Sequence, residues 1–147
     1  MVQLFHVTKR YTREGRALDD LTLRIDKGEF VLITGPSGAG KTTLLKLIFA
    51  AERPSAGQLL VAGHAVHNLR RGSVPLLRRN IGVVFQDFRL LRHLSAFDNV
   101  ALPLRVAGAR ESDIRRHVSE LLTWVGLRDH MEARPPTLSG GQQQRVA

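Results

Sequence analysis

The chain contains no cysteine among its 147 residues. This absence excludes disulfides, thiolate metal sites and a cysteine nucleophile, and it agrees with a reducing compartment such as the cytoplasm. No run approaches the roughly 18 apolar residues that a membrane-spanning helix needs, and the first residues, MVQLFH, lack a signal-peptide layout. With 43% hydrophobic and 24% charged residues, the composition is that of a soluble globular domain with a real core.

Acidic residues are scarce as well. Only 13 Asp and Glu face 22 Lys and Arg, all but four of them arginines, which gives a net charge of +9. Between residues 64 and 93, six arginines accompany a single acid, Asp87. Such a balance suits nucleic acid or an anionic membrane surface. We favour the simpler explanation of a solvated basic face, or of a longer protein whose acidic part lies beyond Ala147, because charge reports on association rather than on fold.

Residues 35–42, GPSGAGKT, match the phosphate-binding pattern G-x-x-x-x-G-K-[ST] at every fixed position. The pattern is meaningful only between a strand and a helix, and both flanks comply. Residues 30–33 form a short apolar run bounded by turn residues, which predicts a fully buried strand. The apolar residues after the loop predict a helix that ends near Ala51. The sequence therefore predicts a nucleoside triphosphate site.

The residue types in this loop explain how it would hold phosphate. Glycines allow backbone angles and close approaches that a side chain would block, so the loop amides form a concave anion site at a helix N-terminus. Lys41 is expected to reach the terminal phosphates, and the Thr42 hydroxyl to ligate Mg²⁺. The candidate phosphate-binding residues are Gly35, Pro36, Ser37, Gly38, Ala39, Gly40, Lys41 and Thr42.

Other patterns predict the elements around the loop. Short strands are expected at residues 4–7, 21–25, 59–62 and 81–85, the last of them buried. Ser95 and Asp98 predict the start of a helix, which Pro103 should kink or shorten and Gly108 should end. A further helix is predicted over residues 112–125, with the single tryptophan packed at its end.

Near the end of the chain, two features coincide at one helix start. Ser139, followed by Gln142, predicts a capping box. Gly140 and Gly141 occupy the first turn, where glycine is a poor helix former. Stability alone would not select these glycines. We therefore expect something to touch this backbone, and bare amides at a helix N-terminus suit a phosphate.

Residues 138–142, LSGGQ, resemble the signature motif of ABC-type ATPases. Gln86 after an apolar run resembles the Q-loop of this family, and Tyr11 resembles its aromatic A-loop residue, which stacks on adenine. The four motifs occur in the family's order, and the resemblance covers the whole chain. It implies an α/β fold, a P-loop NTPase of ABC type. Residues 1–86 would form an antiparallel β subdomain with the phosphate-loop core strands and helix, and residues 87–147 the Q-loop region and a helical subdomain ending in the signature helix.

The resemblance also implies roles, with ATP and Mg²⁺ as the ligands. Lys41 and the loop amides would hold phosphates, Thr42 the Mg²⁺ and Thr43 a further phosphate oxygen. Gln86 would contact the metal, sense the γ-phosphate and report to a membrane partner. In a head-to-tail homodimer, the ATP site of the opposite subunit would be completed by Ser139, Gly140 and Gly141. Simpler alternatives stay open, with Tyr11 as a strand-edge packing residue and Ser139 as an ordinary N-cap.

Within the family, residues 75–87 and 97–104 are most similar to the bacterial cell-division ATPases, which pair with an integral-membrane partner of the FtsX type. They are less similar to ATPases of lipoprotein-release and macrolide-efflux transporters, whose Q-loops usually lack an acid at the position of Asp87. Pro36 departs from the cell-division pattern, where histidine is frequent. The resemblance implies a cytoplasmic ATPase, peripheral on the inner face of the cell membrane, with no nucleic acid as partner.

Family members also carry a Walker B strand ending in Asp-Glu, a D-loop and a switch histidine after the signature helix. None of these occurs before Ala147, so we expect the N-terminal portion of a longer protein, inactive by itself. Three alternatives stay open: a soluble ABC protein acting on DNA or ribosomes, a phosphate-loop kinase outside the family, and a truncated, non-catalytic nucleotide-binding fragment. The LSGGQ motif argues against the kinase, and the lack of long insertions argues against the soluble protein.

Overall fold

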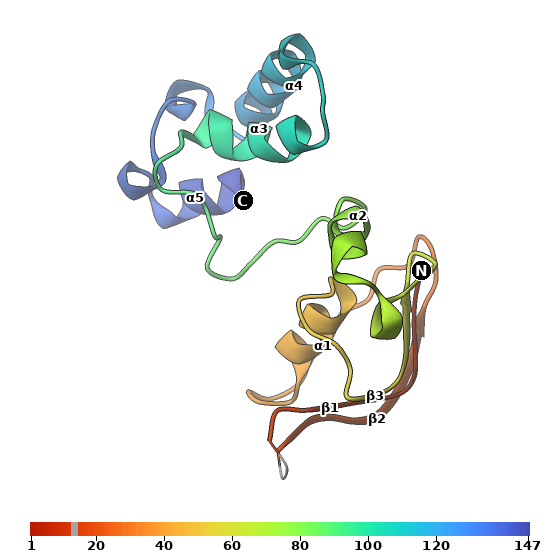
Figure 1. Ribbon diagram of the computed structural model, residues 1–147. Coiled ribbons are helices and arrows are strands. Elements are labelled where there is room, and N and C mark those ends of the chain that lie inside the picture. Colours follow the sequence, from red (N-terminus) through yellow and green to blue (C-terminus); the bar gives the residue numbers. More distant parts are fainter. Residues whose placement is uncertain (13–14) are drawn as a thin grey trace. The chain divides into compact units, whose positions relative to one another are not determined.

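The computed structural model describes residues 1–12 and 15–147. The chain divides into two compact units, Met1–Val83 and Val84–Ala147 (Figure 1). The first unit holds the β-sheet and the phosphate loop, and the second is helical. Each has its own apolar core. None of the helices in the described ranges is both long and apolar enough to span a membrane.

The first unit is built on a four-stranded antiparallel sheet in the order β2-β1-β3-β4. The strands are β1 (Val2–Arg10), β2 (Arg16–Ile25), β3 (Ala56–Val61) and β4 (His64–Ala65). Leu4 in β1 faces Leu23 of β2 on one side and Leu59 of β3 on the other. The strands predicted around these three leucines are confirmed. β1 and β2 are longer than predicted, because backbone pairing continues past the apolar positions that signal a strand.

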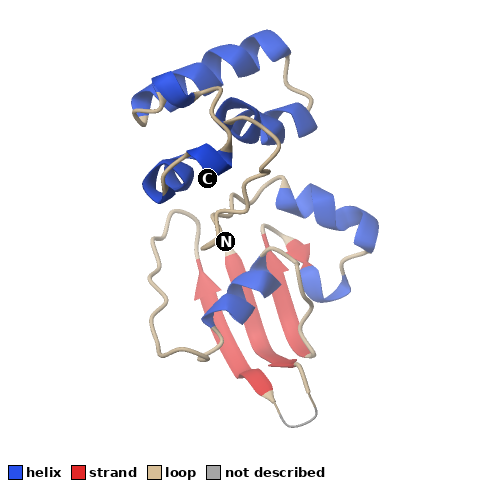
Figure 2. Ribbon diagram, turned by 90° about the vertical axis from the view of Figure 1, so that its left-hand side faces the viewer, coloured by secondary structure: helices blue, strands red, loops and turns tan. Residues whose placement is uncertain are grey.

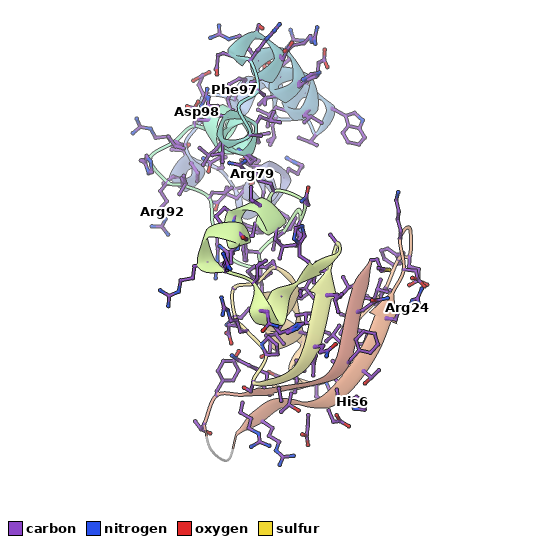
Figure 3. All side chains as sticks on the ribbon, turned by 45° about the vertical axis from the view of Figure 1, so that its right-hand side comes forward. His6, Arg24, Arg79, Arg92, Phe97 and Asp98 are labelled. Atoms are coloured by element: carbon purple, nitrogen blue, oxygen red, sulfur yellow. The ribbon has the colours of Figure 1, made fainter. Side chains whose placement is uncertain are left out.

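A bulge in β1 decides which of its side chains reach the core. Leu4 and Val7 are both buried, although their odd spacing would place them on opposite faces of a regular strand. The register shifts between them, where His6 has a φ of +51°. Asp20 in β2 has a φ of +50°, and its carboxylate lies 2.8 Å from Nδ1 of His6. The bulge turns Val7 inward and leaves His6 exposed outside the sheet (Figure 3).

The helix α1 (Lys41–Ile48) follows the phosphate loop and lies against one face of the sheet (Figure 2). Leu44 and Leu47 of this helix are buried against side chains of the sheet. The 3₁₀ helices η1 (Val66–Asn68) and η2 (Arg71–Ser73) and the short helix α2 (Val74–Arg78) complete the unit. The buried core consists of Leu4, Val7, Leu44, Leu47, Leu59, Val61, Val66 and Leu77. It therefore fixes α1, and with it the loop, relative to the sheet.

α1 ends at Ile48, before the predicted end near Ala51. The cause is a left-handed residue, since Ala50 has a φ of +55° and cannot continue a right-handed helix. The guanidinium of Arg78 donates hydrogen bonds to the carbonyl oxygens of Phe49 and Ala50, at 3.1 Å each. These bonds satisfy carbonyls that the helix end leaves open and join α2 to the end of α1.

The buried strands predicted at residues 30–33 and 81–85 are wrong, because neither segment is a strand here. Phe30, Leu32 and Val84 are 94%, 76% and 71% exposed. An apolar run becomes a buried strand only when neighbouring strands supply hydrogen bonds and cover. Within the described residues, no strand pairs with either segment.

The second unit contains three α-helices, α3 (Ala96–Val106), α4 (Glu111–Trp124) and α5 (Gly140–Val146), in its described residues. Two 3₁₀ turns, η3 (Arg128–His130) and η4 (Pro135–Thr137), connect α4 to α5. The buried core consists of Ala96, Ala101, Ile114, Val118, Leu122, Leu127, Leu138 and Val146. The helices predicted near Ser95, over residues 112–125 and after Ser139 are confirmed.

The ends of α3 follow the sequence signals, but its interior does not. The Ser95 hydroxyl oxygen accepts a hydrogen bond from the Asp98 amide at 3.1 Å, as a cap should. Gly108, with a φ of +81°, ends the helix as predicted. Pro103 does not shorten it, since the helix continues to Val106. Pro103 lies on the exposed side, where solvent can bond the carbonyl that the missing N–H leaves free.

Arg105 ties the two long helices together. Its guanidinium lies 2.7 Å from the Asp98 carboxylate and 2.9 Å from that of Glu111, the first residue of α4. Hydrogen bonds from Arg105 lower the pKa of both carboxyl groups. A carboxyl with a lowered folded-state pKa stabilises the fold at neutral pH, and this contribution is lost as the pH falls through that pKa.

The prediction that Trp124 packs at the end of α4 is wrong. Its side chain is 84% exposed, whereas Ile114, Val118 and Leu122 of the same helix are buried. Trp124 lies two positions beyond Leu122, which is a rotation of about 200° around a helix. It therefore faces away from the core, on the same side as the exposed Leu121.

Candidate nucleotide-binding site

The phosphate loop needs its glycines for geometric reasons. Gly35, Gly38 and Gly40 have φ angles of +148°, +82° and +87°, which side chains of L-residues rarely tolerate. At Gly40 a Cβ atom would lie 2.3 Å from the carbonyl oxygen of Ala17 in β2. The close approach of the sheet therefore excludes a side chain at Gly40 independently of its backbone angle.

α1 begins directly after this loop with an open N-terminus. Gly40 is the N-cap residue, and among the described residues no side chain caps the helix. The first-turn amides of Lys41, Thr42 and Thr43 thus lie at the positive end of the helix dipole without a side-chain acceptor. This arrangement suits an anion with several oxygens.

Lys41 lies across the loop. Its ammonium group donates to the carbonyl oxygens of Gly35 and Pro36, at 2.6 Å each. Both acceptors are neutral, and a phosphate oxygen is a stronger, charged acceptor. The structure therefore holds the cation at the rim of the loop, where a phosphate can take over its hydrogen bonds.

Tyr11 lies beside the start of α1, although 32 positions separate it from Thr43. The Tyr11 O–H group donates a hydrogen bond to Oε1 of Glu52 at 2.8 Å, and its oxygen lies 3.3 Å from Oγ1 of Thr43. Thr43 is buried, whereas Tyr11 is 53% exposed. The structure thus brings Tyr11 and the phosphate loop together and leaves more than half of the tyrosine exposed.

Gln86 belongs to the second unit and lies in an exposed turn. The Phe88 amide donates to the Phe85 carbonyl oxygen at 3.0 Å, which closes the turn around it. The guanidinium of Arg89 lies 4.2 Å from the centre of the Phe85 ring and 3.3 Å from the Asp87 carboxylate. These contacts stabilise the turn, in which Gln86 is exposed.

The LSGGQ segment, also in the second unit, forms the predicted capping box. Oγ of Ser139 accepts a hydrogen bond from the backbone N–H of Gln142 at 3.3 Å, and the side-chain Oε1 of Gln142 accepts one from the backbone N–H of Ser139 at 2.8 Å. A Cβ atom added at Gly140 or Gly141 would meet no described atom within 4 Å. Nothing within the described chain therefore requires these glycines to be small, which supports the expectation of a contact from outside.

Sequence reasoning missed the polar side chains around Tyr11 and α1. Glu52 contacts Tyr11, Lys9 and Lys46, and Arg78 holds the end of α1. Most of these contacts join residues far apart in the chain, so no local pattern announces them. The one available signal was Glu52 itself, a lone acid between the apolar end of a helix and a proline turn.

Residues 18–147 match the family model described as ABC transporter. The chain belongs to the ABC transporter family. Similar members include the cell division ATP-binding protein FtsE of Mycobacterium tuberculosis, 51% identical over 148 residues, with 100% of this chain and 64% of the relative covered. FtsE of Escherichia coli K12 is 50% identical over 146 residues, with 99% and 66% covered. The methionine import ATP-binding protein MetN of Photorhabdus laumondii is 42% identical over 150 residues and is covered over 44% of its length.

Solved structures of the ABC family agree with this fold. A dimeric ATP-binding cassette in a post-hydrolysis state, bound to ADP and Pi, matches with a TM-score of 0.91 and 38% sequence identity. The match covers 99% of this chain and 66% of that one. The expected fold class, a P-loop NTPase of ABC type, is confirmed. The chain spans about two thirds of the length of the two FtsE relatives and of this cassette.

Proposed function

We propose that this chain is the ATP-binding part of an ABC-type ATPase that couples ATP binding and hydrolysis to a membrane partner in bacterial cell division. The observation that carries ATP binding is the open N-terminus of α1, with Lys41 held across the glycine loop by two neutral carbonyls. Half-identical relatives named as cell division ATP-binding proteins support the cellular role. A partner of the FtsX type would place the protein at the inner face of the membrane.

Within this proposal, each residue of the loop has a role. Lys41 and the loop amides bind the phosphates, Thr43 adds a hydroxyl contact, and Tyr11 stacks on adenine. No group of three His, Asp or Glu side chains in the described ranges could hold a metal ion alone. Mg²⁺ would therefore arrive with ATP and bind phosphate oxygens and the Thr42 hydroxyl, since oxygen is the ligand that this ion prefers. Gln86, in the second unit, is assigned separately as a metal-sensing side chain.

The second part of the proposal is a head-to-tail homodimer. The first turn of α5 would contact the nucleotide of the opposite subunit through Ser139, Gly140 and Gly141. The open surface at both glycines supports this role, and the similar cassette structures are dimers.

Two substitutions at Ser139 separate capping from the contact between subunits. Ser139→Ala should lower the free energy of unfolding by about 1 kcal/mol, because it removes the N-cap acceptor. Ser139→Asp keeps an acceptor, and hence stability, but places a negative charge where phosphate is expected. In the full-length protein it should abolish dimerisation induced by a non-hydrolysable ATP analogue, measured by analytical ultracentrifugation. Normal dimerisation of the aspartate variant would contradict the trans contact.

The third part concerns the membrane partner. The segment after Gln86, residues 87–94, carries exposed Leu91, Arg89 and Arg92. The Asn99 side chain braces it, accepting from the Leu91 amide at 2.8 Å and donating to the Leu91 carbonyl oxygen at 3.2 Å. Arg92 points away from the helices of its unit (Figure 3). Phe88, Leu90 and Leu94 of this segment are half-buried, so its exposed apolar residue is Leu91. We assign this exposed, braced surface to a cytoplasmic segment of the partner.

Charge reversal tests this assignment and the proposed function together. Arg92→Glu, alone and with Arg89→Glu, should lower recovery of an FtsX-type partner several-fold in co-purification. The reversed charge would be buried in the interface opposite groups that complement an arginine, which opposes docking. ATP binding should stay intact. The matched control is Arg115→Glu with Arg116→Glu, exposed on α4 of the same unit. Undiminished recovery of the partner with Arg92→Glu would count against docking here, and recovery of an import or efflux permease instead would favour transport.

A further inference from the structure

Glu52 lies at the centre of a polar cluster next to Tyr11. Its side chain is only 21% exposed. Tyr11 donates to Oε1 at 2.8 Å, and the Lys9 ammonium lies 3.0 Å from Oε2. Lys46 of α1 lies 3.5 Å from Oε1. One carboxylate therefore joins the end of β1 to the phosphate-binding helix and to the turn that follows it.

We propose that Glu52 is a positioning residue for the adenine base. Its carboxylate fixes the Tyr11 hydroxyl, so that the ring is held ready to stack on a flat, neutral base before the nucleotide arrives. This inference rests on the proposed function, in which Tyr11 contacts adenine.

The geometry around Tyr11 is that of a ring anchored at its tip. The hydroxyl has two neighbours, Glu52 and Oγ1 of the buried Thr43, at 2.8 and 3.3 Å. Lys9 lies over the ring, 5.1 Å from its centre. More than half of the residue, 53%, is nevertheless exposed. A tyrosine with a fixed hydroxyl and an open ring loses little rotamer entropy on stacking, which is the general advantage of preorganisation.

Burying the Glu52 carboxylate costs desolvation free energy, which apolar packing at the same place would not cost. Burial by itself raises the pKa of Glu52, but the hydrogen bond from Tyr11 and the contacts of Lys9 and Lys46 lower it below its ordinary value. The carboxylate is therefore ionised at neutral pH, and an ionised acceptor binds a phenol more strongly than a neutral one. Apolar residues of similar size would fill the same space without burying charge. The arrangement thus makes sense when the position of the Tyr11 hydroxyl matters.

The cluster also keeps base and phosphate contacts separable. Lys41 and the first-turn amides lie at the loop, whereas Glu52 contacts Tyr11 and two lysines outside it. The Tyr11 hydroxyl also approaches Oγ1 of Thr43 at 3.3 Å, but Thr43 is buried and fixed within α1. A change at Glu52 should therefore affect ligands that carry a base and spare ligands that consist of phosphates alone. A general loosening of α1 would affect both.

The experiment measures binding of Mg²⁺-ATP and of Mg²⁺-tripolyphosphate to the full-length protein by titration calorimetry. Glu52→Gln should weaken ATP binding roughly five- to tenfold, the scale of one lost hydrogen bond of ordinary strength, and change tripolyphosphate binding less than about twofold. Tyr11→Phe, which keeps the ring and removes only the hydroxyl, should have the same effect. The double variant should be no weaker than either single variant. Glu120→Gln, an exposed glutamate on α4, is the control.

Each alternative outcome of this experiment contradicts a specific part of the proposal. Equal weakening of ATP and tripolyphosphate by Glu52→Gln would show that the residue acts through α1 and not through the base. Unchanged ATP binding in both Glu52→Gln and Tyr11→Phe would refute the positioning role. If Lys41→Ala weakens both ligands while the two variants bind ATP normally, the proposed function stands and only this inference fails. If the unsubstituted protein binds neither ligand, the proposed function itself fails.

Discussion

Replacing Lys41 by alanine is expected to weaken ATP binding by one to two orders of magnitude. The substitution removes a charge-assisted contact to phosphate, for which about 1.5–3 kcal/mol is typical. It also removes the ammonium group that bridges the Gly35 and Pro36 carbonyl oxygens. The loss should appear when a fluorescent ATP analogue is titrated against the full-length protein.

Lys27→Ala is the matched control for this prediction. Lys27 is exposed in the turn before the phosphate loop, in the same unit as Lys41. Its removal lowers the net charge equally, so a purely electrostatic attraction of the triphosphate would weaken alike in both variants. Equal affinities of the Lys41→Ala and unsubstituted proteins would mean that the loop does not bind phosphate in the proposed way.

The second large effect concerns hydrolysis. We expect residues 1–147 alone to bind nucleotide poorly and to release no phosphate from Mg²⁺-ATP. Hydrolysis of this kind relies on metal coordination and a positioned water, and the sequence contains no Walker B Asp-Glu pair to assist. The exposed apolar segments at residues 30–33 and around Val84 should also promote aggregation. Purified residues 1–147 should be assayed beside a longer form that also carries the Walker B strand and the switch histidine.

Contaminating ATPases are the main risk in this comparison, so both proteins should also carry Lys41→Ala. Turnover by residues 1–147 comparable to that of the longer protein, and abolished by Lys41→Ala, would show that the catalytic groups lie within this chain. The aggregation component is measured separately, by light scattering of the same samples without nucleotide.

Local signals in the sequence predicted local structure well. The capping residues Ser95 and Ser139 and the helix-ending Gly108 are found where the pattern places them, because the groups that form a cap lie within a few residues of one another. The glycine turns at residues 35–40 and the helix start at Lys41 are predictable for the same reason. The glycines, the lysine and the helix start are consecutive in the chain.

Features that depend on distant partners were not predictable. The apolar run at residues 30–33 indicates a segment that needs cover, but the run cannot say which strands supply it. The bulge at His6 leaves only a small signal, since an ordinary alternation would have buried His6 instead of Val7. The contact between Tyr11 and Glu52 joins positions 41 residues apart, and either residue alone fits an exposed loop.

The central place of β1 in the sheet has a consequence for the order of folding. β1 is synthesised before the other strands of the sheet and completes its pairing only with β3, because Leu4 faces Leu59. Most of the contacts between the helices of the second unit join α3 to α4, which are consecutive in the chain. Contacts between residues close in the chain form faster than those that must close a long loop. The helical unit should therefore fold quickly once it is synthesised. The sheet that supports the phosphate loop can form only after β3 has been synthesised, and its formation should be the slower step of folding.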